Sequence, residues 1–432
     1  MTETRLNGAA TVDGAVRVPG DKSISHRALI LGALIRGRSY IGNLSPAADV
    51  AATAQVLRDC GGSVRPFGDG RVSLDGAGPG ISLSSPSAPL DCANSGTTMR
   101  LVSGALAAHD LIATLDGDHS LQRRPMERVA APLRAMGAEV TTLDGHAPMQ
   151  VRGTAAPLGV VHHLKVASAQ VKSAILLAGL NAQGPTVIHE PQPTRDHTER
   201  LLRACAADLE ADGESVTLRP TRLEPFGLRV PGDISSAAFF MALAAARPGW
   251  RVRCLGIGLN PGRTGILEVL TAMGARVEVE EGPMAADVEP QGDVVVTGAP
   301  LHGVTLEAAM VPRCIDEIPV IAVVATQAEG RTEIRGAGEL RHKESDRVAQ
   351  IVAGLRILGV SVEERPDGLT IEGPARLRPG RLDAAGDHRL AMAWAVAASL
   401  IDPAEEACVI DGADVVAVSY PGFFEDLAAL TS

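Results

Sequence analysis

Aromatic residues are scarce in this chain, because tryptophan, tyrosine and phenylalanine together make up only 2% of its 432 residues. Hydrophobic residues still account for 45%, so the cores must be packed from aliphatic and small side chains. No uninterrupted apolar run approaches the ~18 residues of a membrane span, and the first ten residues lack the apolar segment of a signal peptide. We therefore expect a cytoplasmic protein with no membrane partner.

An excess of positive charge is also lacking. Lysine and arginine number 40 against 51 aspartates and glutamates, which gives a net charge of −11. A protein that follows a nucleic-acid backbone needs the opposite balance at its contact surface, so no nucleic-acid partner is expected. A local cationic cleft remains compatible with these numbers.

Closely spaced metal ligands are absent from the sequence. The six cysteines are far apart, which excludes the usual zinc and redox motifs and favours reduced thiols; they are Cys60, Cys92, Cys205, Cys254, Cys314 and Cys408. His162 and His163 form the only tight histidine cluster, and neighbouring residues on a strand point to opposite faces. No metal site is expected.

Two near copies of one segment indicate an internal duplication. The segments 18–25 and 230–237 both begin Val-Pro-Gly-Asp, and 432 residues exceed what a single core usually holds. After this start the first copy has Lys22 and Arg27, whereas the second has Ile234 and the apolar residues that follow it. The chain is therefore expected to have two related halves, of which only the first keeps ion-binding side chains at this position.

A shorter pattern recurs within each half. A leucine-containing helix ends at a glycine and turns into a strand, as expected of a helix that ends in a left-handed glycine; the repeats are 57–64, 133–140, 270–277 and 355–362, with a degenerate copy at 202–209. A sixth copy would be the helix at 424–430, with its following strand supplied by the N-terminus. The pattern predicts an α/β fold of six units of about 70 residues. One domain would then comprise residues 1–20 and 232–432, the other residues 21–231, with a hinge of two chain crossings and a cleft between them.

Several predicted helices begin beside cations. A helix N-terminus offers free amide donors and a positive dipole end, so a lysine or arginine there suits a phosphate or carboxylate. The cations are Lys22 and Arg27, Arg100, Arg123 and Arg124, Arg195, Arg263, and Lys343 with Arg347. Many such helix starts indicate a polyanionic ligand, although any one of these arginines could simply cap or solvate its helix.

Two glycine-rich segments do not match nucleotide-binding motifs. In 14–23, Asp21 separates the last glycine from Lys22, so the Gly-Lys-Ser/Thr ending of a P-loop is missing. In 256–262 the third glycine is displaced from the dinucleotide-binding spacing, which favours a plain turn.

Acidic residues lie in two informative places. Asp316 and Glu317 interrupt an apolar stretch, where carboxylates are costly unless they are paired or used. Segment 341–347 concentrates charge at a predicted helix start, where Lys343 and Arg347, four residues apart, would share a helix face beside Glu344. An exposed charged turn is the alternative for this segment. Segments 94–100 and 387–389 each precede a helix and could be simple caps.

Eight motifs in order along the chain closely resemble the 5-enolpyruvylshikimate-3-phosphate (EPSP) synthase family. They occupy 19–28, 94–100, 123–126, 168–174, 194–200, 315–319, 343–347 and 387–393. The resemblance implies two pseudosymmetric α/β domains, each of three βαβαββ units arranged as an inside-out α/β barrel. It also implies a transferase that moves the enolpyruvyl group of phosphoenolpyruvate to the 5-hydroxyl of shikimate 3-phosphate and releases phosphate. This step leads toward the aromatic amino acids, needs no cofactor and is expected of a monomer.

The resemblance also assigns site residues by matched position. For shikimate 3-phosphate it implies Lys22, Ser23, Arg27, Ser168, Ala169, Gln170, Arg195, Asp316 and Lys343. For phosphoenolpyruvate it implies Lys22, Asn94, Gly96, Arg124, Gln170, Arg347, His388 and Arg389. Asp316 would accept the proton of the 5-hydroxyl, Glu344 would protonate the methylene carbon, and Lys22 would assist catalysis.

Two positions depart from a common family pattern. Val418 stands where many members carry lysine, and Glu339 stands where many carry asparagine, a change that one subgroup shares. The missing lysine removes one expected contact to phosphoenolpyruvate. Gly96, in contrast, has no side chain, so its loop leaves room for glyphosate, an inhibitor of the family that binds at the phosphoenolpyruvate site, whereas a methyl group would crowd it. An enzyme sensitive to glyphosate is therefore expected.

Two alternatives remain open at this point. The sister transferase that acts on UDP-N-acetylglucosamine resembles the same fold but uses a loop cysteine, and no cysteine occurs here between Cys92 and Cys205. A non-catalytic descendant would have lost its acid and base groups, yet Asp316 and Glu344 are both present.

Overall fold

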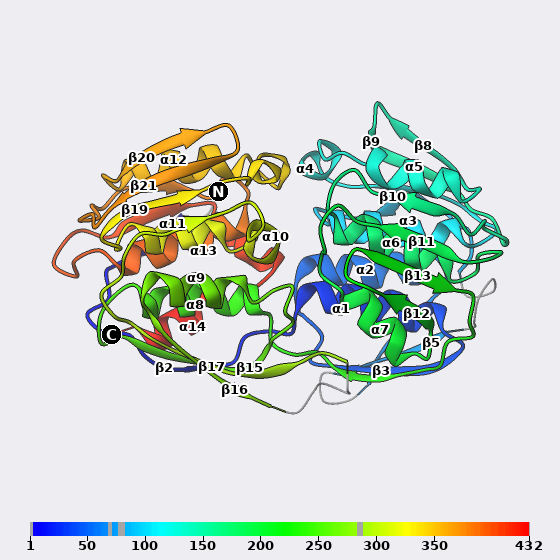
Figure 1. Ribbon diagram of the computed structural model, residues 1–432, viewed down its shortest axis with the longest axis horizontal. Helices are drawn as coiled ribbons and strands as arrows, with labels where there is room; N and C mark the ends of the chain where they lie inside the picture. Colours follow the sequence, from blue (N-terminus) through cyan, green and yellow to red (C-terminus); the bar gives the residue numbers. More distant parts are fainter. Residues whose placement is uncertain (1–2, 68–70, 77–82, 283–287, 432) are drawn as a thin grey trace. The chain divides into compact units, whose positions relative to one another are not determined.

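The structure is a computed structural model that describes residues 3–67, 71–76, 83–282 and 288–431 (Figure 1). The chain divides into two compact units. Unit 1 comprises Met1–Pro19, Pro231–Pro283 and Pro290–Ser432, and unit 2 comprises Gly20–Val230 and Met284–Glu289. Among the described helices, none combines the length and apolar character needed to cross a membrane.

Unit 2 contains three sheets of the same design. In each, two parallel strands are followed by two antiparallel ones. The sheets are β14 (Gly227–Arg229), β3 (Gly37–Gly42), β5 (Arg71–Gly76), β4 (Ser63–Phe67); β6 (Leu90–Asp91), β7 (Ile112–Asp116), β9 (His146–Arg152), β8 (Glu139–Leu143); and β10 (Val161–His163), β11 (Thr186–His189), β13 (Ser215–Arg219), β12 (Asp208–Ala211).

Unit 1 repeats the design in two sheets of four strands and in a third sheet of three strands, which has one antiparallel strand instead of two. Its sheets are β2 (Asp13–Val16), β15 (Arg251–Gly258), β17 (Gln291–Thr297), β16 (Arg276–Glu281); β18 (Thr305–Leu306), β19 (Gly330–Ile334), β21 (Gly368–Gly373), β20 (Ser361–Arg365); and β22 (Arg381–Asp383), β23 (Cys408–Asp411), β1 (Glu3–Leu6). The N-terminal strand β1 pairs with β23, so the first strand does complete the last unit, as the sequence predicts.

Within the described residues, the twelve longer helices fall into two sets. The helices of the first set each follow, along the chain, the strand that is given first for one of the six sheets above. They are α1 (Lys22–Leu34), α3 (Gly96–Ala107), α6 (Ala169–Gly179), α8 (Ile234–Ala245), α11 (Ile318–Ala325) and α13 (His388–Ser399). We call these the inner helices. The second set is α2 (Ala48–Asp59), α5 (Glu127–Ala135), α7 (His197–Ala204), α9 (Gly265–Met273), α12 (Arg347–Ile357) and α14 (Phe423–Leu430). Short helical segments are α4 (His119–Gln122), α10 (Val311–Cys314), η1 (Gly338–His342) and η2 (Ala413–Val418).

The predicted glycine turns are confirmed. Helices α2, α5, α9 and α12 are followed by Gly61, Gly137, Gly274 and Gly359, respectively. The φ angles of these glycines, 84°, 97°, 109° and 85°, are left-handed. This conformation costs glycine little because it has no Cβ. In the degenerate copy Ala206 takes the same conformation, with φ 62°. Each turn leads into the outermost antiparallel strand of its sheet.

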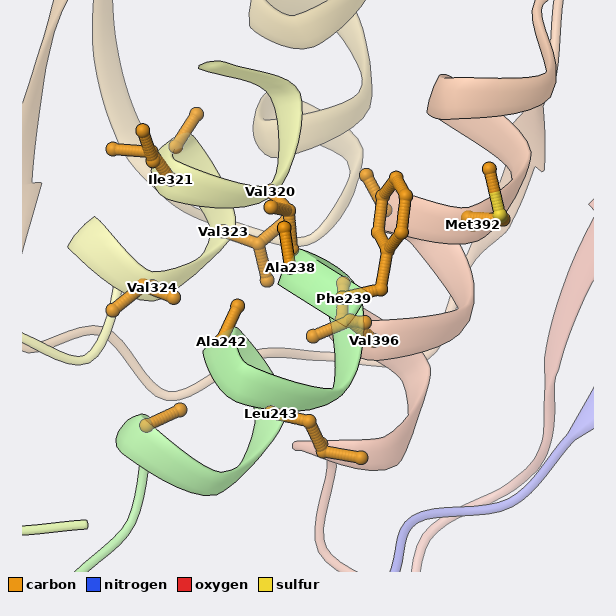
Figure 2. Close-up of a cluster of buried hydrophobic side chains, with 14 of the residues drawn as sticks. Ala238, Phe239, Ala242, Leu243, Val320, Ile321, Val323, Val324, Met392 and Val396 are labelled. Carbon is orange, nitrogen blue, oxygen red and sulfur yellow. The ribbon is translucent and has the colours of Figure 1, made fainter. Parts of the chain in front are cut away.

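The duplicated Val-Pro-Gly-Asp segments play the same structural part. Asp21 accepts a hydrogen bond from the backbone N–H of Ile24 and so caps α1, and Asp233 accepts one from Ser235 and caps α8. The inner helices are buried almost all round; in unit 1, α8, α11 and α13 pack mainly through small and aliphatic side chains, together with Phe239 and Met392 (Figure 2). The α/β fold with two pseudosymmetric halves is therefore confirmed. Cations lie near the N-terminal ends of α1, α3 and α13, where they are Lys22, Arg100 and Arg389.

Candidate active site

In unit 1, one carboxylate lies among three cations. The Asp316 Oδ1 atom is 3.8 Å from Lys343 Nζ, 3.5 Å from an Arg347 terminal nitrogen and 3.8 Å from Arg389 Nε. Asp316 sits between α10 and α11, and its own backbone oxygen accepts a bond of 3.3 Å from Arg389. With Glu344 and Asp387, these four residues form what we call the Asp316 cluster.

Arg347 is the buried centre of this cluster. Its side chain is only 1% exposed, and its guanidinium donates to Glu344 Oε2 at 2.6 Å and to Asp387 Oδ2 at 2.7 Å. Burial disfavours the charged form, but the neighbouring Asp387 and Glu344 carboxylates outweigh it and raise the pKa of Arg347 above its ordinary value. Arg347 therefore remains a fixed positive charge.

The expected helix over 343–347 is wrong in detail. Helix α12 begins only at Arg347, because the Asp346 side chain caps it by accepting from the backbone N–H of Ala349 at 3.1 Å. Lys343 has an extended backbone after η1, so it does not share a helix face with Arg347. The two cations still converge, because both face Asp316. Arg341 in η1 pairs with Asp346 and Glu364, so part of this segment is an exposed charged turn.

The start of α13 completes the cluster. Asp387 caps the helix by accepting from the backbone N–H of Arg389 at 3.0 Å, and it also holds Arg347. The cap interpretation is thus correct for Asp387, and a second role is added to it. His388 and Arg389 are both buried.

In unit 2, Arg27 has three fixed partners. Its Nε donates to Thr198 Oγ1 at 2.8 Å, and its terminal nitrogens donate to Ser173 Oγ and to the backbone oxygen of Ser23, each at 2.9 Å. Burial lowers the pKa of Arg27 to about 10, with Glu199 acting against the shift, so Arg27 stays charged near neutral pH. Lys22, the first residue of α1, pairs with Asp49 at 2.8 Å.

A second group of side chains surrounds the start of α3. Arg124, which is buried, donates to Asn94 Oδ1 at 2.7 Å. Arg100 donates to Gln170 Oε1 at 2.6 Å, and Gln170 donates in turn to Thr97 Oγ1 at 2.9 Å. The bonds Arg100–Gln170–Thr97 tie the first turns of α3 and α6 together.

The helix starts themselves offer backbone donors in unit 2. Ser95 caps α3, which begins at Gly96, and Ser168 caps α6, which begins with Ala169 and Gln170. Arg195 lies just before α7 and is partly buried. The structure therefore brings Asn94, Gly96, Arg124 and Gln170 together around α3. It also gathers Asp316, Lys343, Glu344, Arg347 and Arg389 in unit 1.

Several residues that shape these clusters were not assigned to either substrate from the sequence. They are Asp49, Thr97, Arg100, Ser173, Thr198 and Asp387. All of them except Asp49 lie inside the eight family motifs, so the motifs could have pointed to them. Nothing in the sequence marks Asp49 as the partner of Lys22. Val418 ends η2 and is partly buried, and Glu339 is exposed in η1.

The buried histidine beside the unit 2 cations yields a prediction about stability. Burial, together with the charges of Lys22 and Arg27, holds the pKa of His26 well below its ordinary value. The folded protein thus keeps His26 neutral while the unfolded chain takes up a proton near pH 6.5, so stability should fall as the pH drops below that point. The slope is at most about 1.4 kcal/mol per pH unit for each such histidine. Burial also lowers the pKa of His109 and His162, which adds to the effect.

Denaturant unfolding at pH 7 and pH 5.5 checks this expectation. His26→Gln should reduce the loss of stability between the two pH values, whereas His163→Gln, at an exposed position, should leave it unchanged. An unaltered pH dependence in His26→Gln would show that this histidine is not the source.

Comparisons with known proteins agree with the geometry. The family model for EPSP synthase (3-phosphoshikimate 1-carboxyvinyltransferase) matches residues 6–427. The chain is 48% identical to a 3-phosphoshikimate 1-carboxyvinyltransferase of Acidithiobacillus ferrooxidans over 98% of this chain and 96% of that protein. It is 45% identical to one of Geobacillus kaustophilus over 98% of each.

Solved structures give the same result. The EPSP synthase of Acinetobacter baumannii superposes with a TM-score of 0.87 at 40% identity, covering 99% of this chain and 98% of that one. The enolpyruvyl transferase NikO of Streptomyces tendae, at 20% identity and a TM-score of 0.79, shares the fold, with 99% and 96% of the two chains covered. On sequence and fold together, the chain belongs to the EPSP synthase family.

Proposed function

We propose that the chain transfers the enolpyruvyl group of phosphoenolpyruvate to the 5-hydroxyl of shikimate 3-phosphate, with release of phosphate. The observation that carries this proposal is the Asp316 cluster, where a carboxylate that can take a proton lies among three cations that can hold anions. Family membership over nearly the whole chain supports the same reaction. Both substrates are anionic, and each combines a phosphate with a carboxylate.

We assign the substrate contacts by the family motifs. Shikimate 3-phosphate is held by Lys22, Ser23, Arg27, Ser168, Ala169, Gln170, Arg195, Asp316 and Lys343. Phosphoenolpyruvate is held by Lys22, Asn94, Gly96, Arg124, Gln170, Arg347, His388 and Arg389. The fixed partners of Arg27, Arg124 and Arg347 support this assignment, because a preorganised cation loses little side-chain entropy when an anion binds.

The proposed chemistry is an addition followed by an elimination. Asp316 takes the proton of the 5-hydroxyl while the hydroxyl oxygen bonds to the enol carbon of phosphoenolpyruvate. Glu344 delivers a proton to the methylene carbon of phosphoenolpyruvate. The tetrahedral intermediate then loses a methyl proton and phosphate, which restores the double bond. Lys22 and the arginines stabilise the charge that develops on the phosphate and carboxylate oxygens.

A coupled assay of phosphate release tests the function. Turnover is expected when phosphoenolpyruvate is supplied with shikimate 3-phosphate. No turnover is expected with UDP-N-acetylglucosamine in its place. If phosphate were released with UDP-N-acetylglucosamine but not with shikimate 3-phosphate, the chain would have the sister activity instead. If no phosphate were released with either acceptor, a non-catalytic descendant would be favoured.

We also propose that units 1 and 2 are the two domains of a monomeric cytoplasmic enzyme. Unit 1 carries Asp316, Lys343, Glu344, Arg347 and Arg389, and unit 2 carries most of the shikimate 3-phosphate residues. Light scattering of the purified protein at assay concentration gives the mass; a value near 44.7 kDa is expected, and twice that value would mean a dimer.

Gly96 provides a prediction about inhibition. A Cβ atom added at Gly96 would lie 3.1 Å from an Arg124 terminal nitrogen and 3.2 Å from one of Arg100. Both groups could shift by a few tenths of an ångström, so Gly96→Ala should fold, but the methyl group would narrow the phosphoenolpyruvate site. The inhibitory concentration of glyphosate, the bulkier ligand, is expected to rise much more than the Michaelis constant of phosphoenolpyruvate. Equal increases in both would refute the steric account.

A further inference from the structure

One buried ammonium group holds both ends of the segment that carries Arg195. The segment 190–199 leads from β11 into α7. Lys172, on α6, places its Nζ atom 2.7 Å from Glu190 Oε2 at the start of the segment and 2.6 Å from Glu199 Oε1 at its end. All three side chains are 2% exposed.

The choice of lysine here is informative. Of the 40 lysines and arginines in the chain, only four are lysines. They are Lys22, Lys165, Lys172 and Lys343, and arginine stands at all the remaining positions. An ammonium group has three donors, and Lys172 has three acceptors, the third being the backbone oxygen of Thr194 at 3.5 Å. Burying this charge is costly unless its donors are used. Its hydrogen bonds all reach one segment.

The held segment acts on the proposed phosphate-binding arginines. It contains Arg195, and it contains Thr198, whose hydroxyl accepts from Arg27 Nε at 2.8 Å. Ser173, the neighbour of Lys172 on α6, accepts from another nitrogen of Arg27 and lies 2.7 Å from the Thr198 hydroxyl. Moving α7 away from α6 would therefore displace two Arg27 partners relative to each other.

A second buried pair braces the same segment independently. His197 Nδ1 lies 2.6 Å from Glu289 Oε1, and both side chains are 1% exposed. Glu289 comes from a distant part of the chain and belongs to unit 2. The start of α7 is thus fixed by Lys172 on one side and by Glu289 on another.

We infer that Lys172 is a positioning residue for shikimate 3-phosphate: through Glu190 and Glu199 it sets the place of Arg195 and of Thr198, and through Thr198 the orientation of Arg27. Lys172 itself does not touch the substrate. The inference rests on the proposed function and assigns one more residue to it. The phosphoenolpyruvate residues Asn94, Gly96 and Arg124 lie outside segment 190–199, and Arg124 donates to Asn94 beside the start of α3, so the affinity for phosphoenolpyruvate should be largely unaffected.

Steady-state kinetics of Lys172→Met tests the inference. The Michaelis constant of shikimate 3-phosphate should rise at least about tenfold, because misplacement of a supporting group can cost up to about 10²-fold. The constant for phosphoenolpyruvate should change less than about twofold. Glu199→Met keeps Lys172 paired with Glu190 but removes the bond from Lys172 to α7, and it should raise the same constant if Lys172→Met fails to fold.

The control is Leu176→Ala, a cavity variant of the same helix at a fully buried leucine. It destabilises unit 2 without removing a bond to the segment, so its substrate constants should match the wild type. The inference is overturned if folded Lys172→Met or Glu199→Met leaves the shikimate 3-phosphate constant within about twofold of the wild type, or raises both constants equally. Absence of wild-type turnover would instead refute the proposed function, so the two failures are distinguishable.

Discussion

Asp316→Asn is expected to lower kcat by about 10²–10⁴-fold, the contribution typical of a positioned general base. The amide is close in size to the carboxylate but cannot accept the proton of the 5-hydroxyl. It also removes the negative charge that lies within 3.8 Å of Lys343, Arg347 and Arg389. The anionic substrates should still bind, because the three cations remain. Phosphate release under saturating substrates measures the change.

A matched control separates the loss of the base from the loss of any ion pair. Asp411→Asn, also in unit 1, breaks a pair with Arg381, whose side chain is 62% exposed. Exposed pairs contribute about 0–1 kcal/mol, so this variant should keep wild-type kcat. If Asp316→Asn retained more than about a tenth of wild-type kcat, Asp316 would not be the proton acceptor.

Glu344→Gln is expected to reduce kcat by a similar factor of about 10²–10⁴, since glutamine cannot deliver a proton to the methylene carbon. Glu344 also bonds Arg347 at 2.6 Å, and the amide oxygen of glutamine can keep that bond. Folding and substrate binding should therefore survive. Single-turnover rates with both substrates at saturation isolate the chemical step.

The control for this variant is Glu268→Gln, which removes a carboxylate that pairs with Arg313 at a half-exposed position. Its rate should match the wild type. A Glu344→Gln rate near that of Glu268→Gln would assign the proton donor to another group.

The fold followed closely from local signals in the sequence. The helix ends at Gly61, Gly137, Gly274 and Gly359 were predicted because a left-handed turn leaves its mark as a glycine at a fixed place after a leucine. The completion of the last sheet by β1 was also predicted, from the count of units. These features depend on residues that are close in sequence or on the repeat itself.

The site was harder to derive where it depends on contacts between distant residues. Lys22 and Asp49 pair over 27 positions, and Arg347 and Asp387 over 40. Neither sequence separation matches a helix or strand period, so the sequence gives no sign that these residues are in contact. The helix expected at Lys343 failed for a local reason, because Asp346 is a better cap than it is an interior residue.

The resemblance to the family supplied roles that the residues alone did not. A cationic helix start such as that of α1 indicates an anion, but it does not tell a phosphate from a carboxylate. The motifs narrowed the ligands to two named acids. The hydrogen bonds of Arg27 and Arg124 then explain why each of these cations has a fixed direction.

The most direct test of the central claim is a crystal structure with shikimate 3-phosphate and glyphosate bound. The account predicts that Lys22 and Arg124 of unit 2 and Arg389 of unit 1 all contact the glyphosate anion, with Asp316 within hydrogen-bond distance of the 5-hydroxyl. Ligands held by one unit alone, with Asp316 out of reach of the 5-hydroxyl, would contradict it.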